Sequence, residues 1–145
     1  NTMDIGRAIL PNFDARQRLD AGTYGTMGVG MGFAVAAAVA NPGKRIVAVE
    51  GDAAFGFSGM EVETMARYNL PVTVIVINNN RMGAVVSELR PGVAPPPSVL
   101  LPGARYEKVM EAFGGRGYFV DRAEDLLPAL TAANEGDGPA LVLCT

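Results

Sequence analysis

The sequence contains no histidine and only one cysteine, Cys144. Without histidine the chain cannot supply an imidazole as a general base, pair one with a serine nucleophile, or use one as a metal ligand. A single cysteine excludes an internal disulfide and fits a reducing compartment, so we expect a cytoplasmic location. Any chemistry must therefore come from carboxylates, amides, backbone groups or a bound cofactor.

Long apolar runs and basic tracts are also missing. No apolar run reaches the roughly 18 residues that a transmembrane helix needs, and no signal-peptide pattern occurs. The net charge is −3 and the two signs are interspersed, which argues against a nucleic-acid partner. We therefore expect neither a membrane nor a nucleic acid among the partners.

The composition is that of one globular domain. The 145 residues are 49% hydrophobic and 19% charged, which is enough apolar material for a core. The chain opens at Asn1 without a leading linker and finishes within the apolar run Ala140–Leu143. We therefore expect residues 1–145 to be a single domain that is a fragment of a longer enzyme.

Two short apolar runs, Ile46–Val49 and Val72–Ile77, flank the stretch that organises the chain. Both are rich in β-branched residues and bounded by turn formers, which predicts buried parallel strands. Between them, Ser58 and Glu61 have the spacing of a capping box and predict a helix that begins there and ends before Pro71. The pattern therefore predicts a strand–helix–strand unit.

Asp52 and Asn79 follow these two strands, where open α/β sheets bind ligands. Their carboxylate and amide oxygens suit Mg²⁺, which prefers oxygen ligands shared with phosphates. The small residues Ala53, Ala54 and Gly56 would let backbone N–H groups approach an anion. Asp and Asn are also common turn residues at strand ends, and a strand-end Asp52 is expected to lie outside the core.

The motif that these residues form resembles that of thiamine-diphosphate-dependent enzymes. Gly51-Asp52-Ala53, then 24 residues, then Asn78-Asn79 matches the family's diphosphate-binding pattern. The flanking text GFSGMEVETMARYNLPV resembles the branch of 2-hydroxyacyl-CoA lyase and oxalyl-CoA decarboxylase. The resemblance covers about residues 1–80 and 99–143. It implies an α/β fold, doubly wound, with a mainly parallel sheet sandwiched by helices.

The resemblance also implies a function and its cofactors. The chain would be the C-terminal diphosphate-binding domain of a carbon–carbon lyase or decarboxylase acting on 2-hydroxyacyl-CoA or oxalyl-CoA, with thiamine diphosphate and Mg as cofactors. No catalytic residue is expected in this chain, because the family's glutamate comes from the pyrimidine-binding domain of a partner subunit in a homo-oligomer. Glu50, Glu61 and Glu63 lie in the wrong motif to replace it. Which acyl-CoA is the substrate stays open.

Site residues carry over one by one. The metal ligands would be Asp52, Asn79 and the main-chain carbonyl of Arg81. The run GTMGVGMGFA would carry the aminopyrimidine pocket, with the Met27 side chain wedged between the cofactor's rings; the alternative is a core methionine that fills a gap. The implied cofactor-binding residues are Asn1, Thr2, Gly25, Thr26, Met27, Gly51, Asp52, Ala53, Ala54, Asn79, Arg81 and Met82.

Residues 81–97 form an atypical loop. After the asparagines the family has a glycine and then an apolar and an aromatic residue, whereas this chain has Arg81-Met82-Gly83. We expect Arg81 to be strained at positive φ and to weaken metal binding. An impaired loop would fit a non-catalytic domain with a scaffold or assembly role. The acetolactate synthase-like branch is a further alternative. A nucleotide-binding domain is disfavoured, because the glycine run lacks G-x-G-x-x-G.

The rest of the chain is expected to build and cover the sheet. Ala84–Leu89 could be helix or strand, and Pro91–Pro97 an irregular connection. Lys108, Glu111 and Arg116 should form a solvated face, whereas Leu126, Leu127 and Leu130 should share one face of a helix. The other predicted helices are Thr2–Leu10, Phe33–Ala40, Arg105–Phe113 and Arg122–Asn134, and the other predicted strands are Arg16–Gly22, Gly117–Val120 and Ala140–Leu143.

Overall fold

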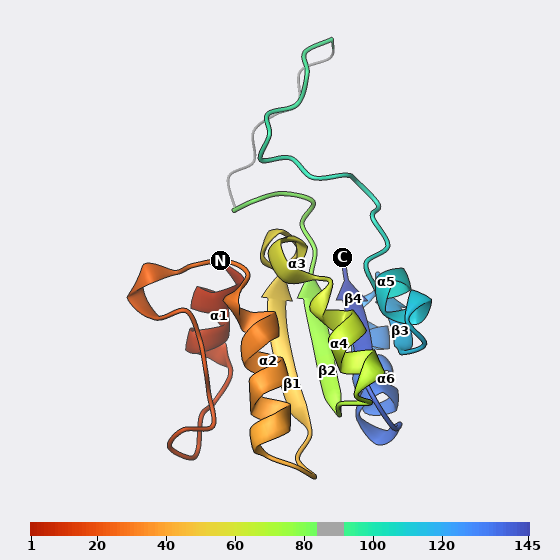
Figure 1. Cartoon of the computed structure of the whole chain (residues 1–145). Helices are drawn as coiled ribbons and strands as arrows, with labels where there is room; N and C mark the ends of the chain where they lie inside the picture. Colours follow the sequence, from red (N-terminus) through yellow and green to blue (C-terminus); the bar gives the residue numbers. More distant parts are fainter. Residues whose placement is uncertain (84–91) are drawn as a thin grey trace.

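The structure, a computed structural model, describes residues 1–83 and 92–145. Within these residues four strands form one sheet in the order β1-β2-β4-β3, and every pairing is parallel (Figure 1). The predictions for Ala84–Leu89 and for Pro91 lie outside the described residues. The strands are β1 (Ile46–Gly51), β2 (Val72–Ile77), β3 (Arg116–Val120) and β4 (Ala140–Cys144).

Helices cover both faces of this sheet. Successive strand residues point to opposite faces, and β4 shows this directly: Leu141 and Leu143 belong to one buried cluster and Val142 to another. The first cluster packs under α2 (Val29–Ala40), α4 (Glu61–Arg67) and α5 (Glu107–Ala112), and the second under α6 (Ala123–Glu135). The predicted doubly wound α/β fold is confirmed.

The first helix, α1 (Thr2–Ile9), lies on the α6 side of the sheet. A Cβ atom placed on Gly51 would lie 3.1 Å from the Thr2 hydroxyl oxygen. The preceding strand residue, Glu50, faces α2 instead, with its carboxylate against Gly30. Because neighbouring strand residues point in opposite directions, α1 and α2 cover opposite faces. None of the helices in the described part of the chain is long and apolar enough to pass through a lipid bilayer.

The connection from β1 to β2 differs from the predicted single helix. It contains two helices, α3 (Asp52–Ser58) and α4, and α3 begins directly after the strand. Ser58 ends α3 instead of capping a helix, and its hydroxyl donates to the Gly28 carbonyl at 2.7 Å. The capping-box prediction is therefore wrong. Helical structure begins at Asp52, earlier than predicted, because the small residues after Asp52 let the chain turn directly into α3.

The predicted strand at Arg16–Gly22 is also wrong. Arg16 has a left-handed φ of 65°, and Gly22–Tyr24 forms the short 3-10 helix η1. Asp20 bends the chain by accepting the Gly22 N–H at 2.8 Å, a common turn device. The Arg7 guanidinium, bonded to Asp20, lowers the pKa of that carboxyl to about 2. This segment is therefore tied to α1 and not to the sheet.

At the amino ends of the strands, two arginines hold the connection from α6 to β4. Arg116 donates to the carbonyls of Ala132 at 2.9 Å, Ala133 at 3.2 Å and Gly138 at 3.3 Å, while Arg45 donates to Gly136 at 2.7 Å. Cations at the carbonyl end of a helix are favourable. The predicted solvated role of Arg116 is wrong, since its Nε is buried.

Two smaller predictions also meet the structure here. Leu127 is 73% exposed, so it does not share the buried face of α6 with its two leucine neighbours. Lys108 and Glu111 form an exposed ion pair at 2.7 Å, as a solvated face requires. The described part of the predicted irregular connection, residues 92–97, contains no helix or strand.

Gly138 gives a direct test of the connection from α6 to β4. It has φ +70°, and an added Cβ would lie 2.3 Å from Asn69 Oδ1. We expect Gly138→Ala to lower the free energy of unfolding by about 1–3 kcal/mol. Gly32→Ala is the matched control, because Gly32 lies in α2 with nothing within 4 Å of its Cβ position, and there alanine should be neutral or stabilising. Urea denaturation measures both, and equal effects would contradict the assignment.

Candidate functional site

The carboxyl ends of β1 and β2 bring the two predicted ligands together. Gly51 lies opposite Ile77 in the parallel register, so Asp52 and Asn79 leave the sheet at the same edge. The backbone N–H of Arg81 donates both to Asp52 Oδ2 at 3.1 Å and to Asn79 Oδ1 at 3.2 Å. The two predicted oxygen ligands, 27 positions apart in the sequence, therefore accept hydrogen bonds from the same nitrogen.

Asp52 is the buried charge of this edge, with 3% of its surface exposed. Its Oδ1 accepts the N–H of Ala53 at 2.8 Å, and its Oδ2 accepts that of Arg81. None of the ion pairs between described residues involves Asp52. The prediction that Asp52 lies outside the core is wrong, because α3 begins at this residue and folds over it.

The three asparagines form a turn whose hydrogen bonds fix the position of the site. The N–H of Asn78 donates to the Cys144 carbonyl at 2.8 Å, and Asn78 Oδ1 accepts the Asn80 N–H at 3.0 Å. Asn79 donates to the Gly83 carbonyl at 3.0 Å. Asn78 therefore anchors the turn to β4, whereas Asn79 faces Asp52 through the shared donor.

The strain predicted at Arg81 is not found. The left-handed residues of this turn are Asn80, with φ 59°, and Gly83, with φ 84°. Asparagine tolerates this region better than most residues, and glycine adopts it freely. Arg81 instead forms an antiparallel bridge with Val99. Asparagine at position 80 thus takes the conformation that the prediction had assigned to the next residue.

A pocket of about 340 Å³ lies beside Asp52. Three of its lining residues were predicted to bind cofactor: Asp52, Ala53 and Met82. Gly56 was named only as a small residue that lets backbone N–H groups approach an anion, and three others were assigned no role in the sequence analysis. The missed residues are Phe57, Leu100 and Tyr106.

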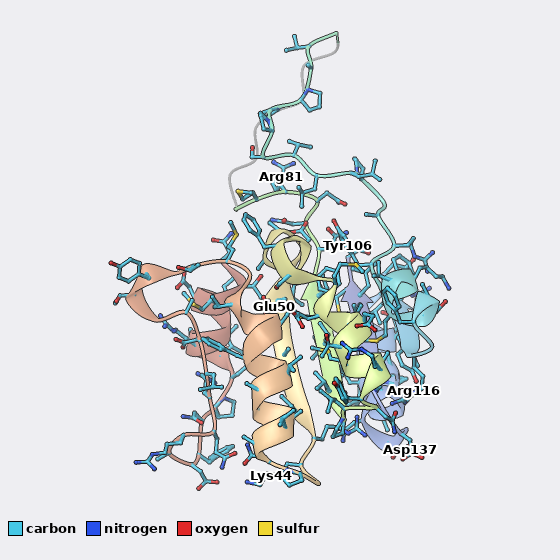
Figure 2. The ribbon with its side chains drawn as sticks, viewed as in Figure 1. Lys44, Glu50, Arg81, Tyr106, Arg116 and Asp137 are labelled. Carbon is cyan, nitrogen blue, oxygen red and sulfur yellow. The ribbon has the colours of Figure 1, made fainter. Side chains whose placement is uncertain are left out.

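The far wall of this pocket comes from the chain that follows the atypical loop. The Asn80 carbonyl accepts the Leu100 N–H at 2.9 Å, and the Ser98 carbonyl accepts the Met82 N–H at 2.7 Å. Figure 2 shows Glu50, Arg81 and Tyr106 toward the carboxyl ends of the strands, whereas Lys44, Arg116 and Asp137 lie at the opposite end. Only long-range pairing could have revealed this wall, and no local sequence signal encodes it.

The glycine-rich turn before α2 packs against α3. Gly25 and Gly28 are left-handed, with φ 62° and 90°, and a Cβ on Gly28 would lie 2.7 Å from Phe57 Cβ. Met27 is 38% exposed, so it is not the buried core methionine of the alternative interpretation. Gly25, Thr26 and Met27 do not line the pocket beside Asp52. The turn is therefore a neighbour of the pocket and not part of its wall.

The N-terminal residues predicted near the cofactor lie at the same edge of the sheet. The Thr2 side chain lies where a Cβ on Gly51 would approach it, as described above, and Asn1 is exposed at the start of α1. Glu50 points the other way, and burial raises the pKa of its carboxyl. A Cβ on Gly30 would lie 1.7 Å from Glu50 Oε1, so only glycine fits at that position unless the Glu50 side chain moves.

The donor set at this edge suits a hard cation. Among the described residues no group of three or more Asp, Glu, His or Cys side chains could hold a metal. A cation here would therefore depend on a mixed set of one carboxylate, one amide oxygen and backbone carbonyls. Such oxygen sets are typical of Mg²⁺ that is shared with phosphate.

Open α/β domains bind ligands at the carboxyl edge of their strands, which is where this chain has Asp52, Asn79 and the pocket. Residues 2–144 match the family described as thiamine pyrophosphate enzyme, C-terminal TPP binding domain. The chain belongs to this family. The resemblance seen in the sequence is confirmed.

Its relatives narrow the branch. The chain is 53% identical over 143 residues to human 2-hydroxyacyl-CoA lyase 1, covering 90% of this chain and 25% of that protein. It is 48% identical over 144 residues to oxalyl-CoA decarboxylase of Escherichia coli K12, covering 98% and 25%. The chain thus spans about a quarter of the length of these relatives.

A solved structure supports the fold. The thiamine diphosphate-dependent 4-hydroxybenzoylformate decarboxylase of Rhodococcus jostii RHA1 superposes with a TM-score of 0.68 at 28% identity. The match covers 83% of this chain and 23% of that one. The predicted α/β fold is therefore shared with a thiamine diphosphate-dependent enzyme.

The burial of Asp52 predicts a cost for removing it. Asp52→Ala would leave the Ala53 N–H without its acceptor and the Arg81 N–H with only its bond to Asn79 Oδ1. We therefore expect the free energy of unfolding to fall by about 1–3 kcal/mol. Asp52→Asn keeps one oxygen and the side-chain shape, and its loss should be smaller. Denaturant titration of both variants measures the difference. If alanine is tolerated as well as asparagine, the carboxylate is not holding this turn.

Proposed function

We propose that the chain is the thiamine diphosphate- and Mg²⁺-binding domain of an enzyme that cleaves a carbon–carbon bond in 2-hydroxyacyl-CoA or oxalyl-CoA. The observation that carries this proposal is the convergence of Asp52 and Asn79 on the Arg81 N–H. In a member of this family, that convergence supports a cation site formed by these two oxygen ligands. The names of the relatives supply the acyl-CoA substrate class.

The residues present fit the metal. Asp52 is a buried carboxylate without an ion-pair partner in the described part of the chain, and a bound cation would neutralise it. Asn79 would turn its amide oxygen from the Arg81 N–H to the same cation. The Arg81 carbonyl would be the third protein ligand.

The fit for the cofactor uses both sides of α3. Thiamine diphosphate, when bound, supplies a nucleophilic carbon and an electron sink for the cleavage. Residues near the diphosphate would be Gly51, Ala53, Ala54 and Met82, of which Ala53 and Met82 line the pocket. The remaining contacts would be made by Asn1 and Thr2 at the first helix and by Gly25, Thr26 and Met27 in the glycine-rich turn.

This chain would supply only part of the catalytic site. Its residues bind and orient the cation and cofactor, whereas the glutamate that pairs with the pyrimidine would come from a pyrimidine-binding domain of a partner subunit in a homo-oligomer. The chain by itself should then not cleave substrate. The single Cys144 supports a cytoplasmic enzyme, because it forms no disulfide within the chain.

The scaffold alternative loses its main support. It depended on a strained Arg81, and the left-handed positions belong to Asn80 and Gly83 instead. The turn after Asn79 is closed by ordinary hydrogen bonds to residues 98–100. The enzyme interpretation is therefore favoured over a non-catalytic domain.

Metal-dependent binding tests the proposal. We expect Asp52→Asn to weaken Mg²⁺-dependent binding of thiamine diphosphate by at least about 10- to 100-fold. Losing a residue that only hydrogen-bonds to a metal ligand already lowers metal affinity by that factor. Asp125→Asn is the control, since Asp125 is an exposed acid in the first turn of α6. Isothermal titration with and without Mg²⁺ measures both. Unchanged binding by Asp52→Asn would exclude Asp52 as a ligand.

The loop is tested by two substitutions at one position. Arg81→Gly and Arg81→Ala both remove the side chain and differ only in backbone freedom. Because Arg81 is not left-handed, we expect their affinities for the Mg²⁺ cofactor to agree within about fivefold, a difference of about 1 kcal/mol. A much tighter Arg81→Gly chain would show that position 81 is strained in the bound state.

A further inference from the structure

The pocket beside Asp52 contains one polar side chain that no family motif covers. Apart from Asp52 and Tyr106, the lining residues are apolar or glycine: Ala53, Gly56, Phe57, Met82 and Leu100. None of the described lining residues is a lysine or an arginine, so a phosphate there would depend on a bound cation and on neutral donors. Within the part of the lining that the structure describes, Tyr106 alone carries a hydroxyl.

The ring of Tyr106 is held by the same helix that begins at Asp52. It packs edge to face on Phe55, with ring centroids 5.6 Å apart and an angle of 65° between the planes. Phe55 is 3% exposed and lies in α3. Tyr106 itself is the N-cap residue of α5. The position of the phenol is therefore linked to that of the Asp52 carboxylate through one buried ring contact.

Among the residues that the structure describes, the hydroxyl of Tyr106 has no hydrogen-bond partner. It makes no hydrogen bond to any residue within 1–83 and 92–145, although partly buried tyrosine hydroxyls usually find one. Burial, and to a smaller extent the charge of Asp52, raise the pKa of the phenol. The group therefore stays protonated at neutral pH and can donate to an anionic oxygen.

We propose that the Tyr106 hydroxyl is a further ligand-binding group of this pocket, which donates a hydrogen bond to a phosphate oxygen of the diphosphate that the cation holds. The inference rests on the proposed function, since Asp52 alone would repel a phosphate. Tyr106 then binds the anion and not the metal. A neutral donor gives the anion a favourable contact in a pocket where Asp52 is the one charged side chain among the described lining residues.

The test distinguishes an effect on binding of the anion from an effect on binding of the cation. Mg²⁺ alone and Mg²⁺ with inorganic diphosphate or thiamine diphosphate are titrated into the chain and into Tyr106→Phe, which keeps the ring contact with Phe55. We expect Tyr106→Phe to weaken both diphosphate ligands by about tenfold and to leave Mg²⁺ alone unchanged. The matched control is Tyr68→Phe, because Tyr68 is exposed at the end of α4 and stacks on Arg67. It should change nothing.

A pH series adds a second readout. The tenfold difference should persist to about pH 9, because an ordinary phenol titrates near 10 and this pKa is higher. Equal diphosphate binding by Tyr106→Phe and parent, with Asp52→Asn impaired, would overturn this inference and leave the proposed function standing. A loss of Mg²⁺ affinity in Tyr106→Phe would also overturn it. Failure of the parent chain to bind any of the three ligands would overturn both.

Discussion

The parallel pairing of β1 with β2 is the constraint on which the site depends. Because Gly51 lies opposite Ile77, the residues that follow both strands emerge at one edge. A shift of the register by one residue would exchange the faces of a whole strand, placing its apolar residues on the wrong side. Val72, Val74 and Val76 are fully buried, so the core that stabilises the sheet also holds Asp52 and Asn79 in place.

Much of this arrangement could be predicted because it is local. The strand residues are contiguous β-branched runs, and the two donors follow those runs directly, so pattern and motif both indicate them. The helix between the strands was misjudged for a physical reason. Ser58 has the right spacing from Glu61 to cap a helix, yet its hydroxyl bonds instead to the distant Gly28 carbonyl. A tertiary contact thus overrides a local signal.

What could not be predicted depends on segments that are far apart in the chain. Leu100 and Tyr106 share a pocket with Asp52 because residues 80–82 pair with 98–100, whereas Phe57 reaches it from the same helix as Asp52. The partly buried position of Arg116 likewise depends on the connection from α6 to β4, to whose carbonyls its guanidinium donates. The expected strain at Arg81 failed for a subtler reason, since one asparagine more in the turn moves the left-handed residue to Asn80.

The short pairing of residues 80–82 with 98–100 holds together the two ends of the segment between them (Figure 1). The segment between Met82 and Ser98 therefore begins and ends at neighbouring points of the molecule. The entropy of closing such a loop grows only with the logarithm of its length, about 0.6 kcal/mol for each doubling. This segment can therefore lengthen, shorten or change its chemistry during evolution at little energetic cost, while Leu100 and Tyr106 keep their positions.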